Sequence, residues 1–520
     1  MTTLALPAPG PRLRGLLLTL LALAGWELAA RALTGAFVLA APSQVLGWLA
    51  ANPGLMARAL RETLTNAAAG FVLGNLAALA LAALALLWPR AQALVTGVAL
   101  VVFCLPLVAT GPILRVIFGP GAGPQIVLAA LAVYYTTLIP LLVGLRAAPA
   151  SWFDLVHSYG RGRWSALVHV RARAALPYLV AGLQIAAPAA FLGAMVGEFT
   201  GAERGMGVLT IRALRGLDVP MTWALATVAT AVAMLAYVAL GALARRLAPD
   251  APPLLLSPPP APARRQGLRA AALVCAATLA LWWGAIALFG LNPFFAKSPT
   301  DVAAALLTDA DAGATRAKLG VALAETAAFL LPGYLAGLAA GAGLAMALVL
   351  APQVAGPVMS AAIALRSVPI VTTAPLIVLA LGRGAAGTVT LVAVMVFFPT
   401  LVACLHGLRQ TPGQVMDVMD SFAATRLTRL LRVRIPAMLP AFFAAARMAV
   451  PAAVLAVTVV EWLATGRGLG SLMALSASLS DYDLLWSAVV LTTTLSALCH
   501  AAVARIEARV LRRYAPEQLT

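Results

Sequence analysis

The sequence predicts an all-α, polytopic membrane protein with about 12 transmembrane helices, arranged as two tandem six-helix repeats. Three observations support this fold class. Hydrophobic residues make up 62% of the 520 positions and charged residues only 10%, whereas soluble globular proteins carry about 25% charged residues. Apolar runs long enough to cross a bilayer recur along the whole chain. A constant numerical offset also relates the second half of the sequence to the first.

The predicted spans are apolar runs bounded by charged residues, proline and glycine. In the first half they lie near residues 15–33, 64–88, 92–116, 124–146, 176–199 and 221–243. A proline-rich, basic stretch follows, and the second set lies near 270–290, 327–350, 355–380, 387–408, 438–463 and 484–504. Each run is long enough for a tilted crossing. We therefore expect a first repeat at 1–246, a cytoplasmic linker at 247–268 and a second repeat at 269–520.

The two repeats align without internal gaps over most of their length. An offset of 263 pairs Glu62 with Glu325, Gly70 with Gly333, Pro106 with Pro369, Asp154 with Asp417, Glu198 with Glu461 and Trp223 with Trp486. Upstream the offset is 257, which pairs Trp26 with Trp283 and Pro42 with Pro299 and implies a six-residue insertion in the loop after the first span. Because each repeat has an even number of spans, both have the same topology. Their interface is a candidate pathway through the membrane.

Arginine clusters predict the orientation in the membrane, because Lys and Arg collect on cytoplasmic loops. They place both termini, the linker and the loops after the fourth and tenth spans on the cytoplasmic side of a bacterial inner membrane. This distribution also explains the net charge of +18 without nucleic acid as a partner. The run after Arg14 is expected to be an uncleaved first span, since its counterpart around Trp283 is internal. The loop arginines are Arg146, Arg161, Arg163, Arg171 and Arg173, then Arg409, Arg426, Arg429, Arg432 and Arg434.

Enzyme chemistry finds no support in the sequence. A P-loop needs Lys directly after Gly, and both lysines, Lys297 and Lys318, follow Ala. The four cysteines lie singly in apolar runs and the four histidines are scattered, which predicts no disulfide framework and no metal site. We expect no catalytic residue and no cofactor bound by this chain.

Two cytoplasmic loops, at 150–175 and 412–438, carry the most specific pattern. Each has an acidic residue, a serine four positions later on the same helical face, a small residue two positions beyond the serine, and then a basic stretch. A short amphipathic helix of this kind can dock into a groove on a soluble partner. The pattern consists of Asp154, Ser158, Gly160 and Arg163 in the first loop, and Asp417, Ser421, Ala423 and Arg426 in the second. Pro177 and Pro440 follow where the next spans are expected to begin.

This pattern resembles the cytoplasmic loop of ATP-binding-cassette (ABC) importer permeases, and more narrowly that of their nitrate, sulfonate and taurine branch. In the first half Ala174-Ala175-Leu176-Pro177-Tyr178 matches the segment behind that loop, and Glu198 and Glu461 each precede a G-x-G turn as in the family. The resemblance covers both halves, from about Pro42 to Trp223 and from Pro299 to Trp486. Bulkier residues replace the family's Ala-Ala pair, and Ala423 replaces glycine, which suggests a dedicated ATPase partner.

The resemblance implies a type I importer permease fold and a permease function for a small, anionic solute. Two copies of a separate ATPase subunit would bind ATP and Mg²⁺ and dock on the two loops, one on each half. An extracytoplasmic binding protein would deliver the solute, and membrane lipid would surround the chain. The coupling residues would be the eight loop residues named above.

The sequence signal for residues of the solute pathway is weaker. Glu198 and Glu461 end the fifth span of each repeat, where a carboxylate could be a gate or a cap on the following loop. Gln184 and Arg447 occupy equivalent positions, so the halves differ chemically along the axis. Arg447 could attract an anion or act as a positive-inside anchor.

A secondary transporter with 12 spans, not coupled to ATP hydrolysis, is the alternative interpretation of the architecture. In that fold the patterned loop follows the second span, whereas here it follows the fourth. A membrane scaffold or receptor is a further alternative, but the chain offers it no extramembrane domain.

Overall fold

A computed structural model of the chain describes residues 11–33, 39–119, 121–247, 264–356, 384–411 and 413–514, together with 358, 377, 381 and 382. Helices and the turns between them account for these ranges, and no strand occurs in them. The all-α prediction is confirmed.

Nine of the described helices are long and apolar enough to cross a membrane. They are Pro53–Leu87, Gly123–Gly144, Trp164–Phe199, Val219–Leu247, Arg269–Leu288, Ala312–Leu350, Ala385–Arg409, Arg426–Leu463 and Tyr482–Tyr514. Each contains one of the predicted spans or most of it. The predicted first span falls on a further helix, α1. The predicted span near 355–380 lies almost wholly outside the described residues, as does most of the expected linker at 247–268.

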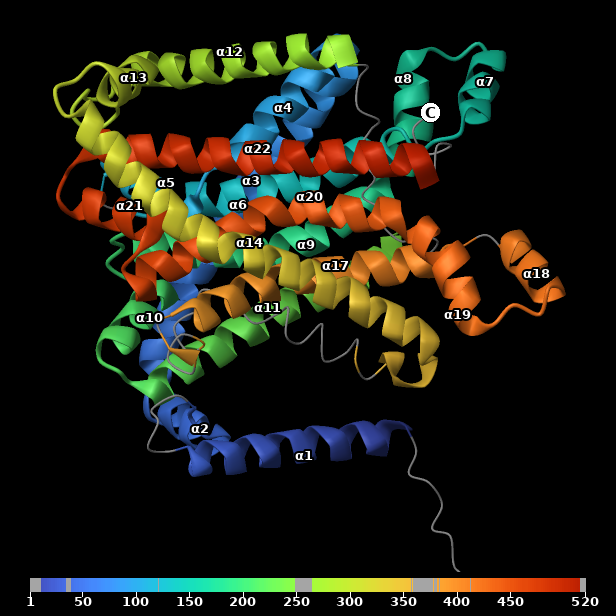
Figure 1. Cartoon of the computed structure of the whole chain (residues 1–520), viewed down its shortest axis with the longest axis horizontal. Coiled ribbons are helices and arrows are strands. Elements are labelled where there is room, and N and C mark those ends of the chain that lie inside the picture. The colour runs from blue at the N-terminus through green and yellow to red at the C-terminus, as the bar shows by residue number, and fades with distance from the viewer. Residues whose placement is uncertain are drawn as a thin grey trace, which may run out of the picture.

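The first half is built from eleven labelled α-helices (Figure 1). They are α1 (Pro11–Ala32), α2 (Pro42–Ala51), α3 (Pro53–Leu87), α4 (Gln92–Phe103), α5 (Leu107–Phe118), α6 (Gly123–Gly144), α7 (Ala150–Ser158), α8 (Arg163–Ala166), α9 (Ala172–Phe199), α10 (Met206–Arg215) and α11 (Val219–Leu247). A π-helical turn, η3 (Leu167–Arg171), joins α8 to α9.

The described part of the second half repeats this order. It consists of α12 (Arg264–Leu288), α13 (Pro299–Leu307), α14 (Ala312–Leu350), α17 (Ala385–Arg409), α18 (Gly413–Ser421), α19 (Arg426–Arg429), α20 (Ile435–Val460), α21 (Gly468–Ser478) and α22 (Tyr482–Tyr514). The π-helical turns η5 (Leu430–Arg434) and η6 (Glu461–Thr465) flank α20. The six-residue insertion lies after α13: only Asn52 separates α2 from α3, whereas four residues separate α13 from α14 and α14 begins earlier in the alignment.

The third predicted span, 92–116, is not one straight helix. The helices on either side of residues 104–106 meet at 93°. Pro106 has an extended backbone, with ψ 103°, at the start of α5. Proline has no amide N–H to continue the helix, so the chain turns here and forms a bent pair instead of a single rod.

Pro177 and Pro440 do not mark the start of a span, contrary to the prediction. A continuous helical stretch begins near Trp164 and at Arg426, and each proline lies inside it. A proline within a helix removes one main-chain hydrogen bond. Membrane helices tolerate this where neighbouring helices pack around the site.

Small residues let the spans approach closely. In the first half α3 packs on α6 at Gly70, where an added Cβ would collide with Ala129. In the second half α14 packs on α17 at Gly333, where an added Cβ would lie 2.6 Å from the Cβ of Val392. The helix trio α3, α6 and α9 thus recurs as α14, α17 and α20.

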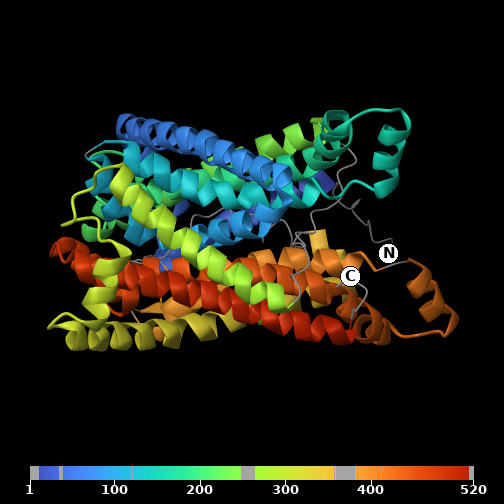
Figure 2. The same cartoon turned by 90° about the horizontal axis from the view of Figure 1, so that it is seen from above.

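The two halves lie side by side (Figure 2). Helices of both halves pack across this boundary. In one place α12 of the second repeat lies on α4 of the first, where Val274 fits against Gly97, and in another α5 of the first repeat contacts α20, α21 and α22. In each half a tryptophan pair joins the first helix to the last one. The ring centroids are 5.3 Å apart for Trp26 of α1 and Trp223 of α11, and 5.2 Å apart for Trp282 of α12 and Trp486 of α22. Trp282, and not the predicted Trp283, therefore occupies the place equivalent to Trp26.

The loop helices α7 and α8, and likewise α18 and α19, project from one end of the bundle (Figures 1 and 2). The short helices α10 and α21 lie at the opposite end (Figure 1). Equivalent segments of the two repeats thus point the same way, as the even number of spans predicts.

Candidate functional site

The projecting helices α7 and α18 have the same internal construction. Ser158 Oγ donates to the carbonyl of Leu155 at 2.8 Å, and Ser421 Oγ donates to that of Val418 at 2.7 Å. Each serine is thus bonded to its own helix and does not pair with the aspartate four residues earlier. Asp154 and Asp417 are both exposed to solvent.

The turns after these helices also match. Gly160 has a φ of +65° and Ala423 a φ of +49°, so both occupy the left-handed region. The amide of the next residue then reaches back to the helix, at 3.2 Å from the Val156 carbonyl in the first loop and 3.0 Å from the Met419 carbonyl in the second. This is the hydrogen bond of a glycine-type helix C-cap. Replacement of the family's glycine by Ala423 therefore leaves the shape of the loop unchanged.

The basic residues of the pattern begin the second helix of each loop. Arg163 is the first residue of α8 and Arg426 the first of α19. Arg426 is exposed. Residues 159–162 and 422–425 separate these helices from α7 and α18, so the arginine and the aspartate of each pattern lie on different helices.

A different side-chain contact stabilises each loop. In the second loop Arg429 forms an ion pair with Asp420, and its Nε donates to the Ala424 carbonyl at 2.9 Å. In the first loop the Arg171 guanidinium lies 5.2 Å from the ring centroid of Phe153. The loops share a backbone and differ in these contacts.

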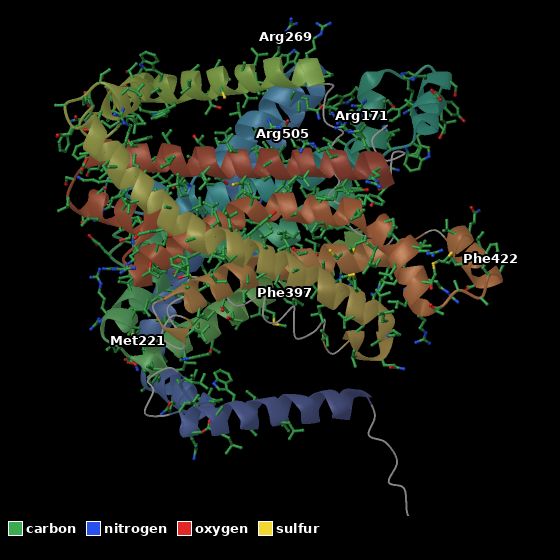
Figure 3. All side chains as sticks on the ribbon, in the orientation of Figure 1. Arg171, Met221, Arg269, Phe397, Phe422 and Arg505 are labelled. Carbon is green, nitrogen blue, oxygen red and sulfur yellow. The ribbon has the colours of Figure 1, made fainter. Side chains whose placement is uncertain are left out.

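Each loop also presents large apolar side chains that are not part of the sequence motif. Four large apolar side chains at equivalent positions are exposed: Trp152 (50%), Leu155 (57%), Tyr159 (75%) and Trp164 (76%) in the first loop, and Val415 (43%), Val418 (55%), Phe422 (79%) and Leu427 (56%) in the second. Figure 3 shows Phe422 at the far tip of its loop. We call these the first and second docking faces. The i, i+3, i+7 spacing of the first three members was the available signal, since it puts them on one side of a helix.

Glu198 lies at the opposite end of the bundle and is buried, with 1% of its surface exposed. Its Oε1 accepts from Thr63 Oγ1 at 2.7 Å and its Oε2 from the Gly207 amide at 2.7 Å. Thr63 Oγ1 in turn accepts from the Met206 amide at 2.9 Å. Gly205, with a φ of +125°, passes so close that a Cβ there would collide with the carboxyl group. These contacts cap the first turn of α10.

Glu461 makes a similar cap on α21. Its Oε2 accepts from the Gly470 amide at 2.8 Å, and Thr326 Oγ1 accepts from the Leu469 amide at 2.9 Å. Here Glu325 takes part as well, since its Oε2 accepts from the Gly468 amide at 2.8 Å. Both glutamates named as gate or cap thus hold a glycine turn at the end of their span.

Gln184 and Arg447 each bond to the last helix of their own half. Gln184 Nε2 donates to the Tyr237 carbonyl of α11 at 3.2 Å. Arg447 Nη1 lies 3.0 Å from Glu507 Oε2 of α22, and both side chains are largely buried. The first half has Ala244 at the position of Glu507, so the buried ion pair belongs to the second half.

The predicted site residues therefore fall into three places. The eight loop residues gather at one end, the two glutamates lie at the other, and the Gln184 and Arg447 contacts lie between neighbouring spans. Met448, beside Arg447, packs against the first-half cluster that contains Tyr134 and Tyr135, which puts Arg447 next to the interface of the halves. Among the described residues, no group of three His, Cys, Asp or Glu side chains could hold a metal ion.

Comparison with known proteins gives two matches to one family model. The model described as "Binding-protein-dependent transport system inner membrane component" matches residues 70–251 and again residues 337–512. The two matches cover more than half of the chain and coincide with the two repeats.

Three curated relatives each match just under half of this chain. A probable ABC transporter permease protein of Haemophilus influenzae is 32% identical over 228 residues, which are 44% of this chain and 90% of the relative. The riboflavin transport system permease protein RibX of Chloroflexus aurantiacus is 35% identical over 45% of this chain and 88% of its own length. The taurine transport system permease protein TauC of Escherichia coli is 24% identical over 45% of this chain and 86% of its own length.

Proposed function

The chain belongs to the family of binding-protein-dependent transport system inner membrane components, and from that premise we propose that it supplies both permease halves of one importer. It is a membrane-embedded ABC permease, and proteins of this family work with ATPase and solute-binding partners. The proposal adds that one chain takes the place of two single-repeat permeases. Its support is that each relative aligns over most of its own length with less than half of this chain.

One ATPase subunit docks on each loop, so that each chain binds two copies. The observation that carries this proposal is the equivalence of the loops. Helices α7 and α18 have the same cap, an exposed aspartate at the same position and exposed apolar residues at the same positions, and they leave the bundle at the same end. ATP and Mg²⁺ are bound by those subunits and not by this chain, and ATP hydrolysis is theirs. Closure of the ATPase dimer pushes both loops and biases the halves between inward and outward openings.

The loop end faces the cytoplasm, and the end with α10 and α21 faces the binding protein. The arginines of the loops support this orientation, since basic residues collect on the cytoplasmic side. Both termini are then cytoplasmic, in a bacterial inner membrane. The repeats remain assigned to 1–246 and 269–520, joined by a cytoplasmic linker at 247–268.

The solute is a small molecule of the nitrate, sulfonate or taurine class. The likeness to a taurine permease and to a putative aliphatic sulfonate permease supports this class of solute. The likeness to a riboflavin permease supports riboflavin as the competing solute. Uptake of taurine, methanesulfonate and riboflavin by proteoliposomes containing the complete importer decides between them. The proposal expects transport of one of the first two, and transport of riboflavin alone would replace the solute class.

Within the membrane we assign Arg447 to the solute pathway and the two glutamates to its outer end. Buried ionisable residues in a span are functional candidates by default. Arg447 supports this assignment because it adjoins the interface of the halves, with Glu507 as its counter-ion. Glu198 and Glu461 act by holding α10 and α21 in place, as their hydrogen bonds to the glycine turns suggest.

The docking proposal is tested by replacing the two exposed aspartates. Asp154→Asn and Asp417→Asn together should detach the ATPase or abolish coupled transport, because both loops lose the charge that faces the partner. The tagged variant is purified in mild detergent, and the co-purified ATPase and its solute-stimulated ATP hydrolysis are measured against the parent chain. Unchanged recovery together with unchanged transport would overturn the assignment of the loops.

A further inference from the structure

We propose that the two loops hold the ATPase unequally, with the first docking face as the tighter site. The inference rests on the proposed function, because it takes an ATPase subunit as the occupant of both faces. It adds an order of attachment that two identical permease subunits could not have.

The faces occupy the same positions but differ in chemistry. Both have exposed side chains at four equivalent positions, so neither is covered by other parts of the chain. The first face presents two indoles and a phenol, from Trp152, Trp164 and Tyr159, whereas the second presents aliphatic side chains and the phenyl ring of Phe422. Tryptophan and tyrosine are enriched among the residues that carry binding energy at interfaces, and leucine and valine are under-represented. Indole N–H and phenol O–H groups also offer hydrogen bonds that aliphatic groups lack.

The backbone conformation of the loops also favours the first docking face as the tighter site. Gly160 takes its left-handed φ of +65° without steric cost, whereas Ala423 takes a φ of +49° with a side chain. The backbone of the second loop is therefore the more strained of the two. Its side chains compensate in part, since Arg429 bonds both to Asp420 and to the Ala424 carbonyl, whereas the first loop has the contact of Arg171 with Phe153.

A soluble partner fits these faces better than the bilayer surface. The helices that carry the faces project beyond the ends of the spans (Figures 1 and 2). This projection, together with the ATPase partners of the family, favours a groove on the ATPase as the occupant of both faces.

Two identical ATPase copies would then meet unequal sites. As the complex is diluted, the copy on the second face should leave first, and a chain with a single ATPase on its first face should accumulate. A symmetric pair of sites would give only the statistical amount of that intermediate.

The test exchanges the faces between the halves. In one variant the first face takes the residues of the second (W152V, L155V, Y159F and W164L), and in the other the second takes those of the first (V415W, V418L, F422Y and L427W). Each complex with its co-purified ATPase is diluted in lipid nanodiscs, and the number of ATPase copies per chain is counted by mass photometry. Gly162→Ala is the control, since Gly162 lies in the first loop with open space around it.

We expect the parent chain to hold its two copies with affinities at least tenfold apart. The first variant should weaken the tighter site roughly 30-fold, which corresponds to a hot-spot loss of about 2 kcal/mol, and should leave two weak sites. The second variant should tighten the weaker site, and the control should match the parent chain.

Equal affinities in the parent chain, or a larger loss when the second face is changed, would overturn the proposal. Quenching of Trp152 and Trp164 by brominated lipids, scored against the W152V/W164L background, would instead identify the bilayer as the occupant. Absence of any co-purified ATPase would contradict the proposed function itself, so the two failures are distinguishable.

Discussion

Ala423 has a backbone conformation that glycine adopts freely and alanine does not. Its φ of +49° matches the +65° of Gly160 in the first loop, and the reverse-turn hydrogen bonds that follow are the same. A left-handed conformation costs a residue with a Cβ about 1–2 kcal/mol. The second loop thus keeps its shape against a local penalty.

Ala423→Gly should therefore stabilise α18, and Gly160→Ala should destabilise α7. We expect shifts of about 1 kcal/mol in opposite directions, because a Cβ is removed from a left-handed residue in one case and added to one in the other. Hydrogen–deuterium exchange of the two loop helices measures both. Gly162→Ala serves as the control, and equal exchange in all three variants would contradict the strain at Ala423.

At the scale of single elements, a buried threonine ties α3 to the start of α10. Thr63 Oγ1 donates to Glu198 and accepts from the Met206 amide, and both partners are buried. The neighbouring Thr65 bonds only to its own helix, at the Arg61 carbonyl, on an exposed face.

Thr63→Val should lower the thermal stability of the purified chain, whereas Thr65→Val should leave it nearly unchanged. The first change strands a buried amide and a buried carboxylate oxygen, which costs about 1–3 kcal/mol. Thermal unfolding in detergent gives the comparison. A cap with no structural importance would reveal itself by equal unfolding temperatures for the two variants.

The ion pair between α20 and α22 allows a cleaner test, since the first half supplies its neutral equivalent. Arg447→Gln alone or Glu507→Ala alone leaves a buried charge unpaired, which costs about 3–5 kcal/mol. The double variant recreates the Gln184 and Ala244 arrangement and should be more stable than either single variant. Unfolding of all four chains forms a double-mutant cycle. Additive effects of the two changes would show that the pair is not coupled.

At the scale of the whole molecule, the repeat made most of the fold predictable. The offset of 263 correctly equated Gly160 with Ala423 and Glu198 with Glu461, because homologous halves share backbone positions. Hydropathy located the spans but not the bend at residues 104–106, since a run of apolar residues does not reveal where the chain turns inside the membrane.

The candidate site was less predictable from the sequence. The aspartates and serines of the loops could be found by motif, but only the structure shows that Trp152 and Phe422 are exposed and not packed against their own loops. The pairing of Arg447 with Glu507 depends on the packing of α20 against α22, which a single sequence does not give. The same limit applies to Trp282, since its neighbour Trp283 fits the alignment better.

If one chain provides both docking sites for a pair of ATPase subunits, both subunits should be recovered with it. The most direct measurement is to purify the tagged chain in mild detergent from its native host and to count the ATPase copies in the complex by native mass spectrometry. We expect one copy of this chain with two of the ATPase. A chain recovered alone and monomeric, able to transport without an ATPase, would contradict it and make the chain a secondary transporter.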